Sequence, residues 1–198
     1  MLEEMLGVSN MRIRATEYRR LAIAVSFATL LSLSSTVAHA SAAPPVCAVE
    51  NVSLGIGQQF SHMTQEQGDI YTLTNRGKAV CLLHGYPRVS YYDKTRRLLP
   101  FKYTQSSSIY MTHTASKTVL LLVGARAFFF VAGSTCQNGK PIEAVTIRVY
   151  LPNAKKPLIG RATAYPETGG GIYYCQGAPN HYERQLDVSP VRADIYHF

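Results

Sequence analysis

The sequence is poor in acidic residues. Its 198 residues include 12 Asp and Glu against 20 Lys and Arg, and the formal net charge is +8 at pH 7. No two carboxylates stand in a context that indicates the acid pair of a glycosidase. The shortage of carboxylates therefore argues against a hydrolase of that class, and the positive charge favours anionic partners.

Motifs for catalysis, metal binding and nucleotide binding are missing as well. The segment Gly133-Ser134-Thr135-Cys136 is not a nucleophile elbow, which needs Gly-x-Ser-x-Gly. There is no Cys-x-x-Cys, no His-Glu-x-x-His, and no Walker or dinucleotide-binding pattern. The histidines after residue 40 are widely spaced, which does not indicate a metal site: His62, His84, His113, His181 and His197. We therefore predict no enzyme activity, no metal and no cofactor.

Long apolar runs are scarce, and the clearest one lies near the N-terminus. Residues 21–33 are uncharged and mostly apolar, and small residues follow at Ala38 and Ala40. Four basic residues precede the run: Arg12, Arg14, Arg19 and Arg20. This order is typical of a secretory signal peptide, here residues 1–40, while the run is too short for a bilayer span of about 20 residues. We expect an exported protein, either periplasmic or fully secreted.

The first ten residues do not fit this signal peptide, because they carry Glu3 and Glu4 and no basic residue. A start at Met11 would give the basic beginning that signal peptides have. The later apolar stretch 120–131 is interrupted by a glycine and an arginine, so we predict no transmembrane anchor in the mature chain. Residues 41–198 remain as a single domain of ordinary size.

The mature chain keeps a positive charge. Sixteen Lys and Arg residues and nine Asp and Glu residues follow residue 40, which gives about +7. In a cytosolic protein this charge would point to nucleic acid, but export makes envelope polymers, lipid head groups and acidic proteins the relevant anions. The alternative is a basic surface that serves solubility alone.

All four cysteines lie in the mature chain, at Cys47, Cys81, Cys136 and Cys175. An even number of cysteines in an oxidising compartment predicts two disulfides. Three connectivities are open from the residues alone. Pairing in sequence order, which we favour, closes two loops of a few tens of residues, each worth about 3–4 kcal/mol by chain-entropy arguments.

The mature chain has the composition and alternation of β-strands throughout, and no stretch of eleven residues keeps a helical period. Turn signals such as Asn75-Arg76-Gly77 and Asn138-Gly139 separate the apolar segments. The expected strands are residues 46–56, 70–74, 89–92, 98–103, 117–123, 127–132, 143–151 and 182–191. About eight or nine short strands with regular turns predict an all-β protein, an antiparallel β-sandwich or barrel.

One segment is specific enough to indicate a family. Residues 71–93 resemble the signature of an exported bacterial family, the domain of unknown function numbered 4232. The matching residues are Thr74, Asn75, Gly77, Cys81, Leu83, Gly85, Tyr86, Pro87 and Val89. The resemblance continues over the mature chain, although Val123 replaces a proline that is usual in the family. It implies an immunoglobulin-like β-sandwich with two disulfides, and it implies no activity.

The residues of this signature are expected to have structural roles. Asn75 and Gly77 are residue types that adopt positive φ, so we expect them to do so in a tight strand connection. Cys81 would join the following strand to Cys47. Gly85 permits a close bend, and Pro87 fixes φ beside it.

The most suggestive surface feature is a group of basic and aromatic residues that interleave over residues 88–103. Arginine and tyrosine are typical of interfaces. On adjacent strands they would form a basic, aromatic face that suits an anionic glycan, a teichoic-type polymer or an acidic protein. The candidate residues are Arg88, Tyr91, Tyr92, Lys94, Arg96, Arg97 and Lys102. The alternative is a solvated sheet face whose tyrosines pack inward, and the sequence leaves both open.

Together these observations predict an exported, non-catalytic β-sandwich domain that acts as a binding or structural module of the bacterial envelope or exterior. An anionic polymer or an acidic protein is the candidate partner, and no nucleic acid is expected. The alternative function is an envelope hydrolase or an inhibitor of an envelope enzyme. A pocket in which two carboxylates, or a serine and a histidine, converge would favour that alternative.

Overall fold

The computed structural model of the chain describes residues 43–61, 66–105, 115–163 and 171–195. The expected signal peptide over residues 1–40, with the alternative start at Met11, lies outside the described residues. Ala42–Phe198 forms one compact unit. Its described residues contain strands and two short 3-10 helices but no α-helix, so the all-β prediction is confirmed. Among the same residues, no helix has the length and apolarity of a membrane span.

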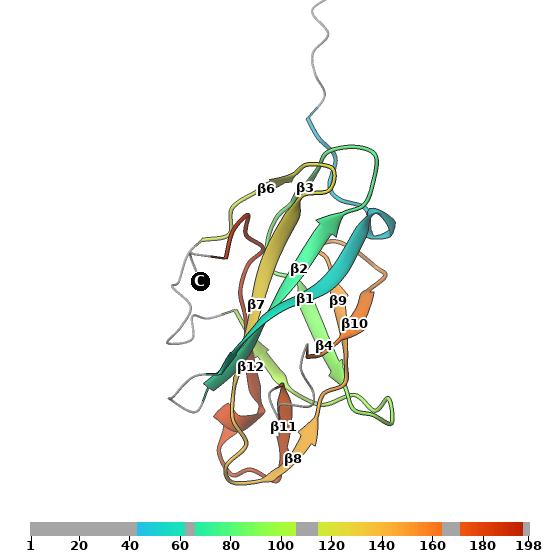
Figure 1. Ribbon diagram of the computed structural model, residues 1–198. Coiled ribbons are helices and arrows are strands. Elements are labelled where there is room, and N and C mark those ends of the chain that lie inside the picture. Colours follow the sequence, from blue (N-terminus) through green and yellow to red (C-terminus); the bar gives the residue numbers. More distant parts are fainter. Residues whose placement is uncertain (1–42, 62–65, 106–114, 164–170, 196–198) are drawn as a thin grey trace, which may run out of the picture. The chain divides into compact units, whose positions relative to one another are not determined.

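One layer of this unit is a five-stranded sheet in the order β1-β2-β7-β12-β5 (Figure 1). Its strands are β1 (Val52–Ser61), β2 (Glu66–Asn75), β7 (Arg126–Ser134), β12 (Gln185–Val188) and β5 (Lys102–Thr104). Neighbouring strands are antiparallel except β12 and β5, which are parallel. The ladder between β2 and β7 runs without interruption from Glu66 opposite Ser134 to Thr74 opposite Arg126.

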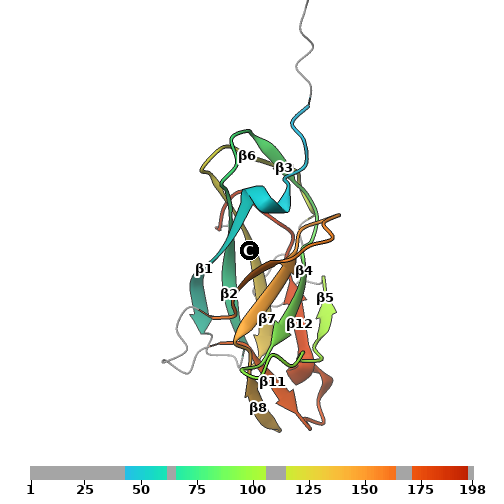
Figure 2. The ribbon, with the colours of Figure 1, turned by 90° about the vertical axis from the view of Figure 1, so that its right-hand side faces the viewer.

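The second layer is a three-stranded antiparallel sheet in the order β10-β9-β4. Its strands are β4 (Arg88–Tyr92), β9 (Thr146–Tyr150) and β10 (Leu158–Arg161). Two small sheets pair β3 (Cys81–Leu83) with β6 (Val119–Leu121), and β8 (Lys140–Glu143) with β11 (Tyr173–Gln176). Figures 1 and 2 both show β3 and β6 at one end of the domain and β8 and β11 at the other.

The hydrophobic core lies between the two layers. Inward positions of strands from both sheets supply its largest fully buried side chains, which include Tyr71, Leu73, Tyr91, Phe129, Ile147, Val149 and Leu186. A smaller cluster of Ile70, Phe130 and Ala132 lies on the opposite face of the five-stranded sheet, because successive strand residues point to opposite sides. The strand alternation thus gives the β-sandwich that the sequence predicted.

Both disulfides that we favoured from the sequence are present. Cys47 joins Cys81 with 4.9 Å between their Cα atoms, and Cys136 joins Cys175 with 5.2 Å. The first bond ties the chain before the 3-10 helix η1 (Val49–Asn51) to β3, and the second ties the loop after β7 to β11. The predicted pairing in sequence order is confirmed.

The described residues form twelve strands, more than the eight or nine expected. We predicted no separate strand at β3, β8, β10 or β11, which have three or four residues each, because such short segments carry too little local signal. The expected strand over residues 182–191 is shorter in the structure, since the 3-10 helix η3 (His181–Arg184) precedes β12. Strands of this length are defined by the partner they pair with, which the local sequence does not specify.

The family signature works differently from our expectation. Neither Asn75 nor Gly77 has a positive φ, so that prediction was wrong. Asn75 is 1% exposed, and its Nδ2 donates to the carbonyl oxygens of Ala79 (2.9 Å) and Leu121 (3.0 Å). Its Oδ1 accepts a hydrogen bond from the backbone N–H of Gly77. Asn75 therefore acts as a buried connector between the turn after β2 and strand β6.

Different structural constraints explain the two glycines of the signature. A Cβ on Gly77 would lie 3.0 Å from the side chain of Asn51, so the close approach of the two segments explains the glycine. Gly85 has φ +92°, a conformation that L-residues with side chains rarely adopt. The predicted bend at Gly85 is thus confirmed.

Candidate functional site

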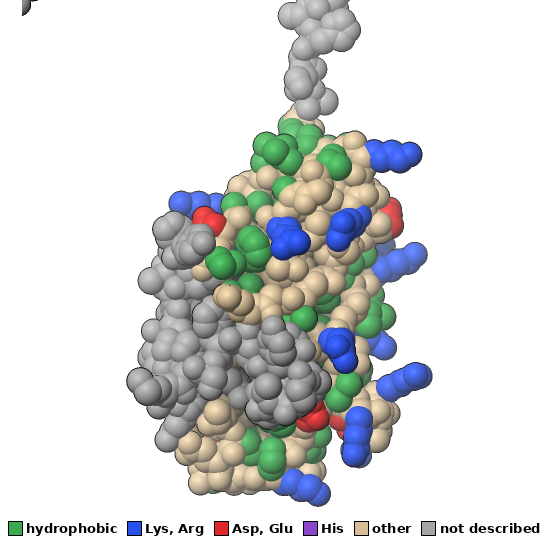
Figure 3. Space-filling view, in the orientation of Figure 1, with side chains coloured by type: hydrophobic (Ala, Val, Ile, Leu, Met, Phe, Trp, Pro, Cys, Tyr) green, Lys and Arg blue, Asp and Glu red, His purple; other side chains and the backbone are tan. Residues whose placement is uncertain are grey.

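The outer face of the three-stranded sheet carries basic and aromatic side chains. Because strand residues alternate in direction, every second residue of β4, β9 and β10 points away from the core. We call five of these outward residues the arginine–tyrosine face: Arg88, Tyr92, Arg148, Tyr150 and Arg161. Figure 3 shows Lys and Arg side chains along the side of the molecule where Figure 1 places β9 and β10.

The strand register brings arginine and tyrosine together in two stacked pairs. Arg88 lies opposite Tyr150, and its guanidinium carbon is 4.8 Å from the centre of that ring. Arg148 reaches from β9 to Tyr92 on β4, with 4.5 Å between guanidinium carbon and ring centre. Each such contact contributes about 0.5–1 kcal/mol at an exposed site. The stacking restricts two long cationic side chains to one region of the sheet.

The arginines form a diagonal row. Arg88, Arg148 and Arg161 lie on three neighbouring strands, and each is displaced by two residues from the next. Diagonal neighbours in a sheet are about 7–8 Å apart. In the described part of the chain, no carboxylate forms an ion pair with any of these three guanidinium groups. The row therefore offers evenly spaced positive charges to solvent.

A basic turn continues from β4 at one end of this face. The Oδ1 of Asp93 accepts hydrogen bonds from the backbone N–H groups of Thr95 (2.8 Å) and Arg97 (2.9 Å) and from the Thr95 hydroxyl (2.7 Å). The bond from the Thr95 side chain is the main cause that lowers the pKa of Asp93. Arg96 has φ +65°, and Lys94, Arg96 and Arg97 are all exposed. Asp93 thus fixes a turn that presents three cations.

The structure groups five of the seven candidate residues and separates the other two. Arg88 and Tyr92 lie on the outer side of β4, and Lys94, Arg96 and Arg97 follow in the turn. Tyr91 was wrongly included in an accessible face: it is 0% exposed because it occupies an inward position of β4. Lys102 is exposed but lies on β5, in the other sheet.

Three residues of the face were not among the candidates predicted from the sequence: Arg148, Tyr150 and Arg161. The alternation of Thr146-Ile147-Arg148-Val149-Tyr150 does indicate that Arg148 and Tyr150 share one side of a strand. It does not indicate that this strand pairs with β4, which lies more than fifty residues earlier in the chain. Local patterns therefore revealed two of the five residues of the face, and the pairing of distant strands supplied the other three.

A buried carboxyl group lies in the core next to two tyrosines. Asp69 of β2 is 0% exposed, and within the described residues neither of its oxygen atoms has a hydrogen-bond partner. Burial raises the pKa of Asp69 from its ordinary value of 3.8 to about 7. Burial, and secondarily the Asp69 charge, raises the pKa of Tyr71 well above its ordinary value. The side chain of Asp69 is closed off from solvent.

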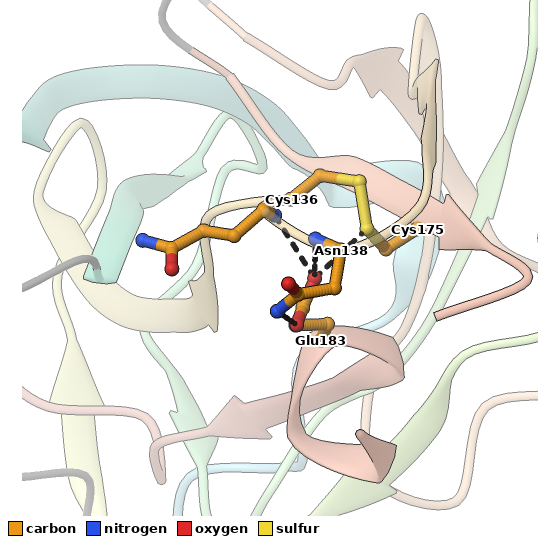
Figure 4. The surroundings of a disulfide bond; sticks show 5 residues. Cys136, Asn138, Cys175 and Glu183 are labelled. Atoms are coloured by element: carbon orange, nitrogen blue, oxygen red, sulfur yellow. Dashed lines mark hydrogen bonds between the residues drawn. A yellow bond between two sulfur atoms is a disulfide. The ribbon is translucent and has the colours of Figure 1, made fainter. Parts of the chain in front are cut away.

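A second carboxylate organises the loop that carries the Cys136–Cys175 disulfide (Figure 4). The Oε2 of Glu183 accepts hydrogen bonds from the backbone N–H groups of Gln137 (2.9 Å) and Asn138 (3.0 Å), and Oε1 accepts one from Asn138 Nδ2 (2.8 Å). These bonds, foremost the one from the Asn138 backbone, lower the pKa of Glu183.

Glu183 also belongs to a group of potential metal ligands. Among the described residues, the potential ligand atoms of Cys136, Cys175 and Glu183 lie within 4.8 Å of one another. Both sulfur atoms are joined in the disulfide, and the carboxylate already accepts three hydrogen bonds. This arrangement fits the fixing of a loop better than the holding of an ion.

The described histidines lie on different elements. His84 follows β3 and contacts the Thr118 hydroxyl at 3.3 Å, while His181 begins η3 and packs against the ring of Tyr182. His62, His113 and His197 lie outside the described residues. The structure thus separates the two histidines that it describes.

Two of the hollows in the described surface lie near the ends of the strands. One, of about 490 Å³, is lined by residues 46–50 and 152–156, and the other, of about 180 Å³, by Ala115 and residues 117–119 and 190–194. Glu50 is the carboxylate of the first hollow, and Asp194 is that of the second. Neither of these two hollows brings two carboxylates, or a serine and a histidine, together.

Comparison with known proteins supports the resemblance seen in the sequence. The family model described as "Domain of unknown function (DUF4232)" matches residues 47–192, which include both disulfides and all strands from β1 to β12. No curated protein matches the chain, and no solved structure matches it. On the extent of the family match, this chain belongs to the family of the domain of unknown function DUF4232.

Proposed function

We propose that the protein is an exported, non-catalytic binding module of the cell envelope or exterior, and that its arginine–tyrosine face binds an anionic polymer. The observation that carries this proposal is the diagonal row of Arg88, Arg148 and Arg161, two of them stacked on tyrosine rings. A polymer with a repeating negative group matches evenly spaced cations better than a single small anion does. The cations of the turn after Tyr92 would extend the contact.

The physical chemistry of arginine supports this choice of ligand. Guanidinium is planar, remains charged at physiological pH, and donates paired hydrogen bonds to phosphate or carboxylate oxygens. Stacking on Tyr92 and Tyr150 reduces the conformational entropy that the arginine side chains would lose on binding. The absence of carboxylate partners in the described residues leaves these donors available to a ligand.

Two further observations support export and the lack of catalysis. Two disulfides in a domain of this size are typical of an oxidising compartment outside the cytosol. The two most buried carboxyl groups are engaged elsewhere, since Asp69 is enclosed in the core and Glu183 holds the loop after Cys136. Neither is available to an external substrate.

The test measures the affinity of oxidised residues 42–198 for three fluorescent polymers: poly(glycerol phosphate), poly-glutamate and neutral dextran. This segment contains the whole described core and both disulfides. We expect salt-sensitive binding of poly(glycerol phosphate) and none of dextran. Removing Arg88 and Arg148 together should weaken binding about tenfold, equivalent to about 1.4 kcal/mol.

A matched variant separates a specific face from general charge. Lys155→Ala with Lys156→Ala removes the same charge from the exposed turn after β9, and it should leave the affinity nearly unchanged. Equal losses in the two double variants would show that only net charge matters and would contradict the proposal. Tighter binding of poly-glutamate than of poly(glycerol phosphate) would instead identify an acidic protein as the partner.

A further inference from the structure

Exposed apolar side chains gather at the end of the domain formed by β3 and β6. Leu120, Leu122 and Val123 are 54%, 58% and 57% exposed, and Val46 is 61% exposed. We call these four residues, together with the half-buried Leu82, the apolar tip. Clusters of this kind on a soluble domain mark interaction sites more often than isolated apolar residues do.

Strand pairing explains why these side chains share one surface. Val46 pairs with Leu82, and Leu82 lies opposite Leu120. The neighbouring positions Cys81, Leu83 and Leu121 are buried, so the alternate residues must point outward. Leu122 and Val123 extend the row into the turn that leads to β7.

Hydrogen bonds and a disulfide fix the backbone that carries the apolar tip. The backbone N–H of Gly124 donates to the carbonyl oxygen of Asn75, and Asn75 Nδ2 donates to the carbonyl oxygen of Leu121. The Cys47–Cys81 disulfide fixes the chain next to Val46 and Leu82. The exposed apolar area is therefore built into the fold.

Basic residues surround the tip. Lys78 lies in the turn after β2, and hydrogen bonds of Asn75 join this turn to the one at residues 122–125. Lys117 precedes β6, and Arg126 is the first residue of β7. Lys155 and Lys156 line the hollow whose other wall is residues 46–50. All five are exposed, while Glu50 is the exposed carboxylate of that hollow. Apolar side chains within a positive rim complement an anionic lipid surface, which offers hydrocarbon beneath negative head groups.

We propose that the apolar tip docks the domain on an anionic lipid bilayer, with Leu120, Leu122 and Val123 entering the head-group region and the basic rim contacting lipid phosphates. This inference is independent of the arginine–tyrosine face, which lies on the side of the domain and remains free for a polymer. Lipid docking would hold the domain at a membrane surface without a spanning helix.

The experiment is flotation of oxidised residues 42–198 with vesicles of phosphatidylcholine alone or with added phosphatidylglycerol. We expect the protein to float with the anionic vesicles and not with the neutral ones. Leu122→Asp with Val123→Asp should reduce binding at least tenfold. Both residues are exposed, so the variant should keep the thermal unfolding temperature of the unaltered protein.

Two control variants locate the site. Ile159→Asp places one of the two negative charges of the tip variant on an exposed apolar residue of β10 and should leave vesicle binding intact. Arg88→Ala with Arg148→Ala should also leave it intact, and a loss there would assign lipid binding to the arginine–tyrosine face and overturn the proposal. Absence of binding to anionic vesicles would overturn it too. Concentration-dependent dimerisation without vesicle binding, abolished by the tip variant, would replace the bilayer with a second copy of the chain.

Discussion

The hydroxyl oxygens of Tyr71 and Tyr91 lie 3.1 Å apart in the core, and the Tyr71 hydroxyl also lies 2.5 Å from the carbonyl oxygen of Ala162. A phenol has one hydrogen to donate, and a carbonyl oxygen only accepts. Tyr71 must therefore donate to Ala162, and Tyr91 must donate to Tyr71. This chain of hydrogen bonds links β2 of one layer to β4 and to the end of β10 in the other.

The direction of the chain predicts unequal costs for its two tyrosines. Tyr71→Phe leaves both the Ala162 carbonyl and the Tyr91 hydroxyl without partners, so we expect a loss of about 2–3 kcal/mol in the free energy of unfolding. Tyr91→Phe removes a donor whose acceptor keeps its other bond, so the loss should be about 1 kcal/mol. Urea unfolding at constant pH measures both. Equal costs would contradict the assigned direction.

Asp69 predicts a pH dependence of stability. Its pKa is about 7 in the folded protein and ordinarily 3.8, so the folded state binds the proton more tightly than the unfolded state. The contribution of Asp69 to the free energy of unfolding is therefore fully present below about pH 4. It falls as the pH rises from about 4 towards 7, and the stability does not change further with this group at higher pH. A shift of about three units corresponds to a loss of about 4 kcal/mol at most.

The measurement is urea unfolding of the protein and of Asp69→Asn between pH 4.5 and pH 8. The variant carries no titrating group at this position, so its stability should change much less over that range. The difference between the two curves isolates Asp69 from histidines and other groups. If both proteins lose the same free energy between these pH values, Asp69 does not carry a raised pKa.

We predict that replacing Asn75, a residue of the family signature, strongly lowers the free energy of unfolding. Asn75→Ala leaves the carbonyl oxygens of Ala79 and Leu121 without a buried donor and the N–H of Gly77 without an acceptor. We expect the free energy of unfolding to fall by about 2–4 kcal/mol. The neighbouring Arg76→Ala, at an exposed position, is the control and should change stability by less than about 0.5 kcal/mol. Thermal unfolding of the two variants and of the unaltered protein measures both changes in stability, and equal changes in the two variants would contradict the role of Asn75.

The same residue shows what sequence reasoning provides and what it misses. The types Asn75 and Gly77 correctly indicated a strand end, but the expected positive φ was wrong, because Asn75 acts through distant partners such as Leu121. Cysteine spacing indicated the disulfides correctly, since chain order already favours the shorter loops. Local patterns are reliable where the cause is local and fail where a contact joins separate strands.

The candidate site follows this rule. Arg88, Tyr92 and the basic turn are adjacent in sequence, so composition alone indicated them. Arg148 and Arg161 enter the face through the pairing of β4 with β9 and of β9 with β10. Tyr91 was misplaced for the opposite reason, since a tyrosine is equally suited to an interface and to a core, and only the phase of the strand decides.

Glu183 predicts a local effect near the second disulfide. Glu183→Ala removes the acceptor of the Gln137 and Asn138 N–H groups, so these two amides should exchange with solvent hydrogen much faster. Because its pKa is lowered in the folded state, the carboxylate stabilises the loop above about pH 4.5, and this support is lost as the pH falls through the folded pKa. Amide exchange followed by NMR at pH 6 and at pH 4 measures both effects.

If Glu183 stabilises only the loop after Cys136, Glu183→Ala should change amide exchange in that loop alone. Amides of β3 and β6, at the end of the domain opposite to β8 and β11, should keep their protection in the variant. Uniform loss of protection across the domain would show that Glu183 supports global stability and that the loop is not an independent unit.

Because Arg148 stacks on Tyr92, we predict that Tyr92, although uncharged, affects the affinity of the arginine–tyrosine face for its ligand. Tyr92→Leu removes no charge, yet it frees the Arg148 side chain, which must then be ordered again on binding. We expect the affinity for poly(glycerol phosphate) to fall about threefold, or about 0.7 kcal/mol. A double-mutant cycle with Arg148→Ala should give a coupling energy of the same size, because Tyr92 acts only through that arginine.

Tyr182→Leu is the matched control, since Tyr182 is an exposed tyrosine of η3 that packs on His181 and not on an arginine. Its affinity should equal that of the unaltered protein. Arg148→Lys refines the test, because lysine keeps the charge but loses the planar group that stacks and donates paired hydrogen bonds. If Arg148→Lys and Tyr92→Leu both bind as tightly as the unaltered protein, the stacked geometry has no part in recognition, and the face attracts polymers by charge alone.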